Sequence, residues 1–85
     1  MRFKCECCGN YSLPMKSSGT DNICAVCYWQ DDFSQLNDPD YAGGPNHVSL
    51  NQARKNYEVF RACSERDHKF TREPYFEELP ENNSE

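Results

Sequence analysis

The chain has 85 residues, of which 36% are hydrophobic, and its mean hydropathy is −0.98. A domain of this size and polarity has a small core and usually needs disulfides or a bound metal to stay folded. The formal net charge of −5 argues against a general nucleic-acid-binding protein, because contact with phosphates favours a basic surface.

The sequence predicts a single domain, residues 1–85, made of four consecutive parts. These are a zinc module (1–28), an acidic connector loop (29–47), a helix (48–64) and an extended acidic tail (65–85). The expected fold class is a small metal-stabilised α+β domain. It combines zinc-ribbon or rubredoxin-like knuckles and short β-hairpins with one C-terminal amphipathic helix packed on them.

Two cysteine pairs in the zinc module have the spacing of a metal site. Cys5 and Cys8 form one C-x2-C pair, Cys24 and Cys27 form the other, and fifteen residues separate the pairs. Two residues between ligands let the backbone turn so that both sulfurs face one point. Two such turns supply four thiolates for one tetrahedral, structural zinc ion. Iron also occupies four-cysteine sites, so the spacing alone does not exclude it.

The residues that follow each pair refine this prediction. A knuckle turn commonly needs a positive φ just after its second ligand, and Gly9 supplies it after Cys8. This favours Cys8 as the ligand, with Cys7 as its substitute. The equivalent position after Cys27 is Tyr28, so the second turn either lacks this feature or is strained. Short hairpins are expected at 2–4 with 11–13, and near residues 23 and 28.

A disulfide framework is the main alternative use of the six cysteines. The N-terminal residues lack the apolar stretch of a secretory signal, and no segment has the apolar length of a membrane span. We therefore expect a cytoplasmic protein, in which thiols stay reduced. Two C-x2-C pairs also favour a metal over a redox C-x-x-C motif, which usually occurs once. Cys63 is expected to be a small buried apolar group.

The connector contains acidic residues that form a candidate partner-binding face. Residues 28–47 hold four acids and no Lys or Arg; the acids are Asp31, Asp32, Asp38 and Asp40. A basic protein partner is the functional interpretation, and a solvated surface is the structural one. Asp31 or Asp32 could instead cap a turn or accept backbone N–H groups. A catalytic or second metal site that includes His47 is not favoured, since nothing in the sequence indicates a nucleophile or a sizeable pocket.

The helix has the clearest secondary-structure signal. Ser49 followed by Gln52 is typical of a capping box. Apolar residues then recur at helical spacing and predict a buried face that packs on the zinc module and Trp29; they are Leu50, Ala53, Tyr57 and Phe60. In the tail, Tyr75 and Phe76 are expected to dock, on the core of the same molecule in preference to a partner.

At this point the sequence resembles a known family. Its motifs are the strings CECCG (5–9), ICAVCYWQDD (23–32), DPDY (38–41) and GGPNHVSLNQAR (43–54). They resemble the cysteine-rich CPCC family of small bacterial and archaeal proteins, over about residues 5–78. Glu6 and Ala25 stand where the family's prolines are expected, which makes each knuckle less preorganised. The resemblance implies a small metal-binding domain and supplies no activity.

The function that the sequence favours is a non-enzymatic structural-zinc protein that acts as a protein–protein interaction module. One alternative is an immunity protein that neutralises a bacterial toxin, such as a nuclease, by masking a basic surface. A second is a thiol redox or metal sensor that uses Cys7. A nucleic-acid-binding zinc ribbon has support only from Arg54, Lys55 and Arg61, and the net charge opposes it. No membrane partner is expected.

Overall fold

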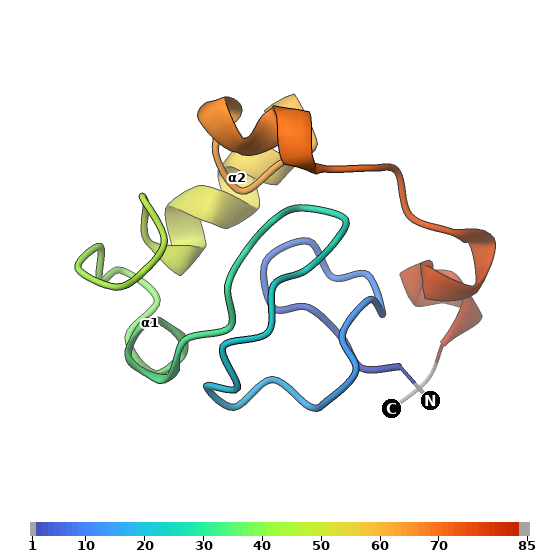
Figure 1. The fold of residues 1–85 in the computed structure, drawn as a ribbon, viewed down its shortest axis with the longest axis horizontal. Coiled ribbons are helices and arrows are strands. Elements are labelled where there is room, and N and C mark those ends of the chain that lie inside the picture. The colour runs from blue at the N-terminus through green and yellow to red at the C-terminus, as the bar shows by residue number, and fades with distance from the viewer. Residues whose placement is uncertain (1, 84–85) are drawn as a thin grey trace.

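The computed structural model describes residues 2–83, and its elements are short. The α-helices are α1 (Phe33–Asn37) and α2 (Leu50–Phe60), and three 3-10 helices follow them: η1 (Glu65–Phe70), η2 (Phe76–Glu78) and η3 (Pro80–Asn82). The N-terminal third of the chain forms loops, and α2 and η1 lie along one side of these loops (Figure 1). After η1 the chain runs to the end of the molecule that lies away from α1. None of the helices found in residues 2–83 has the length and apolarity to cross a membrane.

The predicted hairpins are not confirmed. Within residues 2–83 there are no strands, only the isolated antiparallel bridges Phe3–Leu13 and Ile23–Gln30. Each bridge closes the loop that carries one cysteine pair, which is where the hairpins were expected. The knuckle turns take up the residues between the bridge partners, so the pairing does not extend into a ladder. The fold therefore consists of two cysteine-bearing loops and short helices, with almost no β-sheet.

Helix α2 follows the predicted pattern closely. The Ser49 hydroxyl accepts a hydrogen bond from the Gln52 backbone N–H at 3.1 Å and caps the first turn. Such a cap satisfies a backbone donor that has no partner within the helix. The Gln52 side chain donates forward to Asn56. Leu50, Ala53 and Tyr57 are buried in one core cluster with Trp29 and the cysteines, which confirms the predicted packing for these three residues. The fourth predicted residue, Phe60, is half-buried and lies outside this cluster.

The helix is shorter than predicted, ending at Phe60 where residue 64 was expected. Arg61 adopts a left-handed conformation, with φ of 60°, and stops the helical hydrogen bonding. The chain then turns so that the Cys63 N–H donates to the Cys27 carbonyl oxygen at 2.8 Å. This hydrogen bond ties the end of α2 to the second knuckle, a contact that competes with continuation of the helix.

The connector is more ordered than the predicted loop. It contains α1, whose N-cap is Asp32: its carboxylate accepts from the Gln35 N–H at 3.0 Å. Gly19 passes so close to this helix that an added Cβ would lie 2.7 Å from Phe33 Cβ. Gly19 also has a φ of +91°, so both its backbone and its surroundings require glycine.

The prediction of an extended tail is wrong. Residues 65–83 contain the three 3-10 helices, and Glu78, which is 2% exposed, anchors the tail to the N-terminal module. Its carboxylate accepts two hydrogen bonds from Arg72, at 2.7 and 2.9 Å, and its carbonyl accepts one from the Tyr11 N–H. The expected docking of both tail aromatics is also wrong, because Phe76 is 75% exposed and Tyr75 half-exposed. The tail is held to the N-terminal module by the Tyr11 hydrogen bond and by an ion pair between Arg2 and Glu78 at 3.6 Å, which the pattern of apolar residues could not indicate.

Candidate metal centre

The four predicted cysteine sulfurs come together at one point. The Sγ atoms of Cys5, Cys8, Cys24 and Cys27 all lie within 4.8 Å of one another. Cys5 and Cys27 are 3.7 Å apart, and Cys8 and Cys24 are 3.8 Å apart. A tetrahedral zinc ion with Zn–S bonds of about 2.3 Å places its sulfurs about 3.8 Å from one another. These distances match the donor set of a four-cysteine metal site.

The two turns that carry these sulfurs have the same backbone geometry. In the first, the Gly9 N–H donates to the Cys5 carbonyl at 2.9 Å; in the second, the Tyr28 N–H donates to Cys24 at 2.8 Å. Gly9 has a φ of +81° and Tyr28 a φ of +70°. The second knuckle therefore adopts the same conformation with a bulky residue, as the strained alternative predicted. A left-handed conformation costs a non-glycine residue roughly 1–2 kcal/mol.

Hydrogen bonds distribute negative charge unequally among the four sulfurs. Donation by the neighbouring thiols, Cys27 first, lowers the pKa of Cys24, and the Ser12 hydroxyl at 2.8 Å adds to the effect. The Val26 N–H also lies 3.4 Å from this sulfur. The Cys24 sulfur in turn raises the pKa of Cys5 and of Cys27. With protons alone, the lowered pKa values of Cys24 and Cys8 favour thiolates there over Cys5 and Cys27, and a divalent cation is what would let all four sulfurs ionise together.

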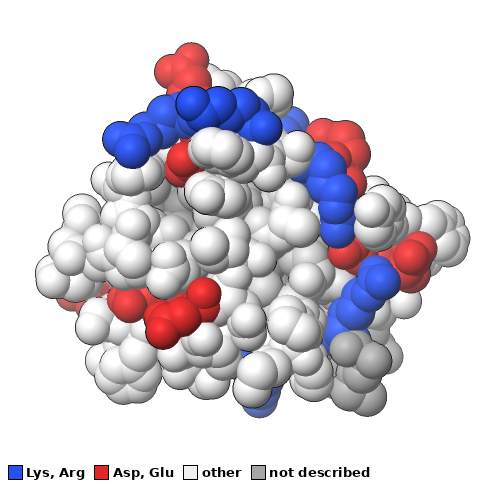
Figure 2. Space-filling view, viewed as in Figure 1, with Lys and Arg blue, Asp and Glu red and all other residues white. Residues whose placement is uncertain are grey.

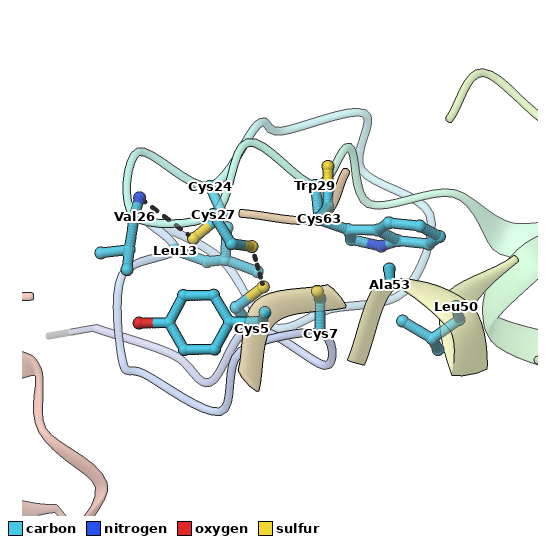
Figure 3. Packing of buried hydrophobic residues seen from close by; sticks show 11 residues of the cluster. Cys5, Cys7, Leu13, Cys24, Val26, Cys27, Trp29, Leu50, Ala53 and Cys63 are labelled. Atoms are coloured by element: carbon cyan, nitrogen blue, oxygen red, sulfur yellow. Dashed lines mark hydrogen bonds between the residues drawn. The ribbon is translucent and has the colours of Figure 1, made fainter. Parts of the chain in front are cut away.

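The remaining two cysteines lie outside this group. Cys7 is 6% exposed and belongs to the hydrophobic core, on the side of the cluster that faces Ala53 and Trp29 (Figure 3). The group of converging sulfurs found in residues 2–83 contains Cys8 and not Cys7. Cys63 is 3% exposed, and burial raises its thiol pKa, with the charges of Cys7 and Asp67 adding to the effect. It is the small buried group that the sequence predicted.

Asp31 has a structural position, which corrects its assignment to a partner-binding face. The side chain is 2% exposed. Its carboxylate accepts five hydrogen bonds from the segment 17–20, three from backbone N–H groups and two from hydroxyls. Burial raises the pKa of Asp31, but these hydrogen bonds, led by that from Ser17, outweigh it and hold the pKa below its ordinary value. Asp31 thus folds the loop between the cysteine pairs.

The other three acids of the predicted face are closer to the surface. Asp38 and Asp40 are exposed, and Asp32 is half-buried as the cap of α1. Asp38 accepts from the Asp40 N–H, and Asp40 accepts from the Asn51 side chain. No Lys or Arg occurs between residues 17 and 53, so these carboxylates have no cation nearby in sequence. Asp and Glu atoms gather over α1 at the lower left of Figure 2.

A buried amide network joins the end of the second cysteine-bearing loop, the connector and the segment before α2. The Asn46 side chain pairs with the Gln30 backbone, accepting from its N–H at 2.8 Å and donating to its carbonyl at 2.9 Å. It also donates to Gln35, whose own amide donates to the carbonyls of Tyr41 and Val48. The sequence prediction missed these residues, because isolated Asn and Gln carry no periodic signal. The only hint is Gly44, where an added Cβ would lie 2.6 Å from Gln35 Oε1.

Two of the three basic residues named for nucleic-acid binding contact other parts of the fold. Arg54 Nε donates to the Glu6 carbonyl at 2.8 Å, which links the helix to the first knuckle. Arg61 forms an ion pair with Glu73 at 3.0 Å and lies over the Tyr57 ring. Lys55, the third of these residues, is exposed.

Comparison with known proteins identifies the family. The family model described as "Cysteine-rich CPCC" matches residues 3–78, which include both cysteine pairs, the connector, α2 and the Glu78 anchor. A search of curated proteins gives no match.

Proposed function

This chain belongs to the cysteine-rich CPCC family, and we propose that it is a non-enzymatic protein, stabilised by one structural zinc ion, that acts as a protein–protein interaction module. The observation that carries the proposal is the convergence of four cysteine sulfurs within 4.8 Å of one another. Cys5, Cys24 and Cys27 are each at most 1% exposed. A closed all-sulfur site suits zinc, leaves no coordination position for a substrate and contributes directly to folding.

The charge distribution and the exposed aromatic residues support an interaction role. Phe33 is 65% exposed beside the capping Asp32, and Tyr41 is 43% exposed beside Asp40. Acidic groups next to aromatic side chains suit a partner that offers basic and apolar groups together. A basic toxin domain is one such partner, and a cytoplasmic location would keep the cysteines reduced. Burial of Cys7 and Cys63 argues against a thiol sensor, since reactive cysteines need an accessible thiolate.

Metal content is the first experiment. Elemental analysis of the native protein should give about one zinc per chain, and iron in its place would overturn the metal assignment. Cys8→Ser should lose the metal, because only three thiolates remain in the group. Cys7→Ser is the matched control and should keep it. Equal metal content in both variants would contradict the ligand set.

The interaction role needs a separate experiment. The metal-loaded protein, immobilised and exposed to the products of neighbouring genes, should retain a defined partner. Asp38→Asn combined with Asp40→Asn should weaken that capture, and more so at low salt, because salt screens surface charges. Failure to retain any neighbouring product, by a protein that holds its metal, would contradict the interaction role alone.

A further inference from the structure

A small pocket lies beside the metal centre, between the second knuckle, the end of the connector and η1. Its volume is about 190 Å³, and the residues that line it are Ile23, Tyr28, Gln30, Pro45, Asn46, His47 and Asp67. Pockets that hold a drug-sized ligand measure roughly 300–1,000 Å³. This one therefore has room for a single side chain, and its walls combine apolar, aromatic and hydrogen-bonding groups.

Asp67 is the charged group of this pocket. The residue is 6% exposed, and its Oδ2 accepts from Ser64 Oγ at 2.7 Å and from Cys63 Sγ at 3.6 Å. Oδ1 takes no hydrogen bond from residues 2–83. Every fully buried side-chain oxygen in that part of the chain has a partner, so Oδ1 keeps some exposure to solvent, and Asp67 is one of the residues that line the pocket. The carboxylate thus has one oxygen committed to the fold and one free for a ligand.

Tyr28 forms an aromatic wall that the fold holds in place. Its ring stacks on Phe70 of η1, with centroids 4.8 Å apart and planes 24° apart. Its backbone has the left-handed conformation of a knuckle, which glycine would adopt without cost. Another lining residue, Asn46, is fixed by its pairing with Gln30. The pocket is therefore already formed in the folded protein, and it depends on the knuckle that carries Cys24 and Cys27.

We propose that this pocket binds the guanidinium group of an arginine side chain from a protein partner. A guanidinium is planar, stacks on aromatic rings and donates to carboxylates, so Tyr28 and Asp67 Oδ1 complement it. The same chemistry occurs twice within this fold, where Arg61 lies 4.3 Å from the Tyr57 ring centroid and Arg72 lies 3.8 Å from that of Tyr75. This inference rests on the proposed interaction role, and the arginine belongs to the protein partner in that role.

Charges around the pocket favour a cation, although the basic residues of η1 oppose it. The protein carries a net charge of −5, and no Lys or Arg occurs from residue 17 to residue 53. Figure 2 shows largely uncharged surface between the Lys and Arg atoms over η1 and the acidic atoms over α1. Lys69 lies 5.3 Å from the centroid of the Phe70 ring that backs Tyr28. Its charge should weaken a bound cation and strengthen a bound anion, so it distinguishes the two.

The test is an NMR titration of the zinc-loaded, isotope-labelled protein with N-acetyl-L-arginine amide, which imitates an arginine within a partner chain. Saturable shifts are expected at Tyr28, Asn46 and Asp67. N-acetyl-L-citrulline amide has nearly the same shape without the charge and should bind at least tenfold more weakly. Equal binding of the two probes would overturn the proposal. Tighter binding of free L-arginine would also overturn it, since that would indicate a small-molecule site.

Three variants complete the test. Asp67→Asn should weaken binding of the arginine probe about tenfold, whereas Glu58→Gln removes the same charge from an exposed residue of α2 and should leave binding within twofold. Lys69→Gln, also at an exposed position, should tighten binding about twofold and remains informative if Asp67→Asn fails to fold. Weaker binding by Lys69→Gln would indicate an anion and overturn the proposal. A protein that holds zinc but ignores the arginine probe would refute this inference and leave the metal assignment intact.

Discussion

The two knuckles place different residues in one demanding backbone conformation. Gly9 and Tyr28 both have positive φ values, and each donates its N–H to the first cysteine of its pair. An ideal Cβ at Gly9 meets nothing within 4 Å, so a substitution there tests the conformation without a steric clash. We expect Gly9→Ala to lower the free energy of unfolding by about 1–2 kcal/mol.

Urea unfolding of the metal-loaded protein measures this loss. Gly9→Asn is the matched comparison and should lose less than Gly9→Ala, because asparagine tolerates the left-handed region better than alanine does. If alanine were as stable as glycine here, the conformational explanation of Gly9 would be wrong.

The charge of Asp31 makes the free energy of unfolding depend on pH. Its pKa is lowered in the folded state, so it contributes stability above its unfolded pKa of about 3.9. That contribution is lost as the pH falls through the lower, folded pKa. We expect Asp31→Asn to lower the free energy of unfolding by about 2 kcal/mol at neutral pH, because it loses charge-assisted hydrogen bonds.

The difference between wild type and Asp31→Asn should shrink as the pH is lowered into this range. Comparison of the two proteins by urea unfolding at each pH cancels the acid sensitivity of the metal site, which both share. Asp38→Asn is the exposed control and should stay within about 0.5 kcal/mol of wild type. A difference that does not change with pH would contradict the role of the Asp31 charge.

At the scale of elements, the Asn46 network replaces the sheet that this fold lacks. Asn46 pairs with the Gln30 backbone as a neighbouring strand would, and Gln35 joins α1 to the segment before α2. Asn46→Asp keeps the acceptor but replaces both donor contacts with a buried negative charge. We expect it to cost about 2–3 kcal/mol of unfolding free energy. Thermal and urea unfolding measure this cost. Asn37→Asp, at an exposed position, should cost far less in the same measurements.

At the scale of the whole molecule, the cysteines of the metal site form part of the hydrophobic core. The core cluster contains the cysteines, Trp29 and the buried face of α2. Structural zinc contributes apparent free energies of about 10–16 kcal/mol in small metal domains. Chelation should therefore remove the circular dichroism signal of α2 as well as the knuckles, and one equivalent of zinc should restore it. A helix that survives chelation would show that the core does not depend on metal.

Glu78 anchors the tail. Its carboxylate accepts hydrogen bonds from the Arg72 side chain and from the Tyr75 N–H. Arg72 is the main cause of the lowered pKa of Glu78. We expect Glu78→Gln to release residues 71–83 and to speed tryptic cleavage at Arg72 at least tenfold, because the buried Glu78 carboxylate loses its ion pairs with Arg2 and with Arg72. Glu77→Gln, whose side chain is 63% exposed, should be cleaved like wild type. Equal cleavage of both variants would contradict the anchor.

The sequence by itself determined the features that arise from local spacing: the convergence of two C-x2-C turns, the need for Gly9, and the start and buried face of α2. Each depends on residues a few positions apart, where backbone geometry alone fixes which atoms meet. Only the tertiary structure decided the burial of Asp31, the Asn46 network, the Glu78 anchor and the pocket at Asp67. These depend on single polar side chains that meet partners from distant segments, and a lone polar residue has no periodicity to indicate whether it faces solvent or core.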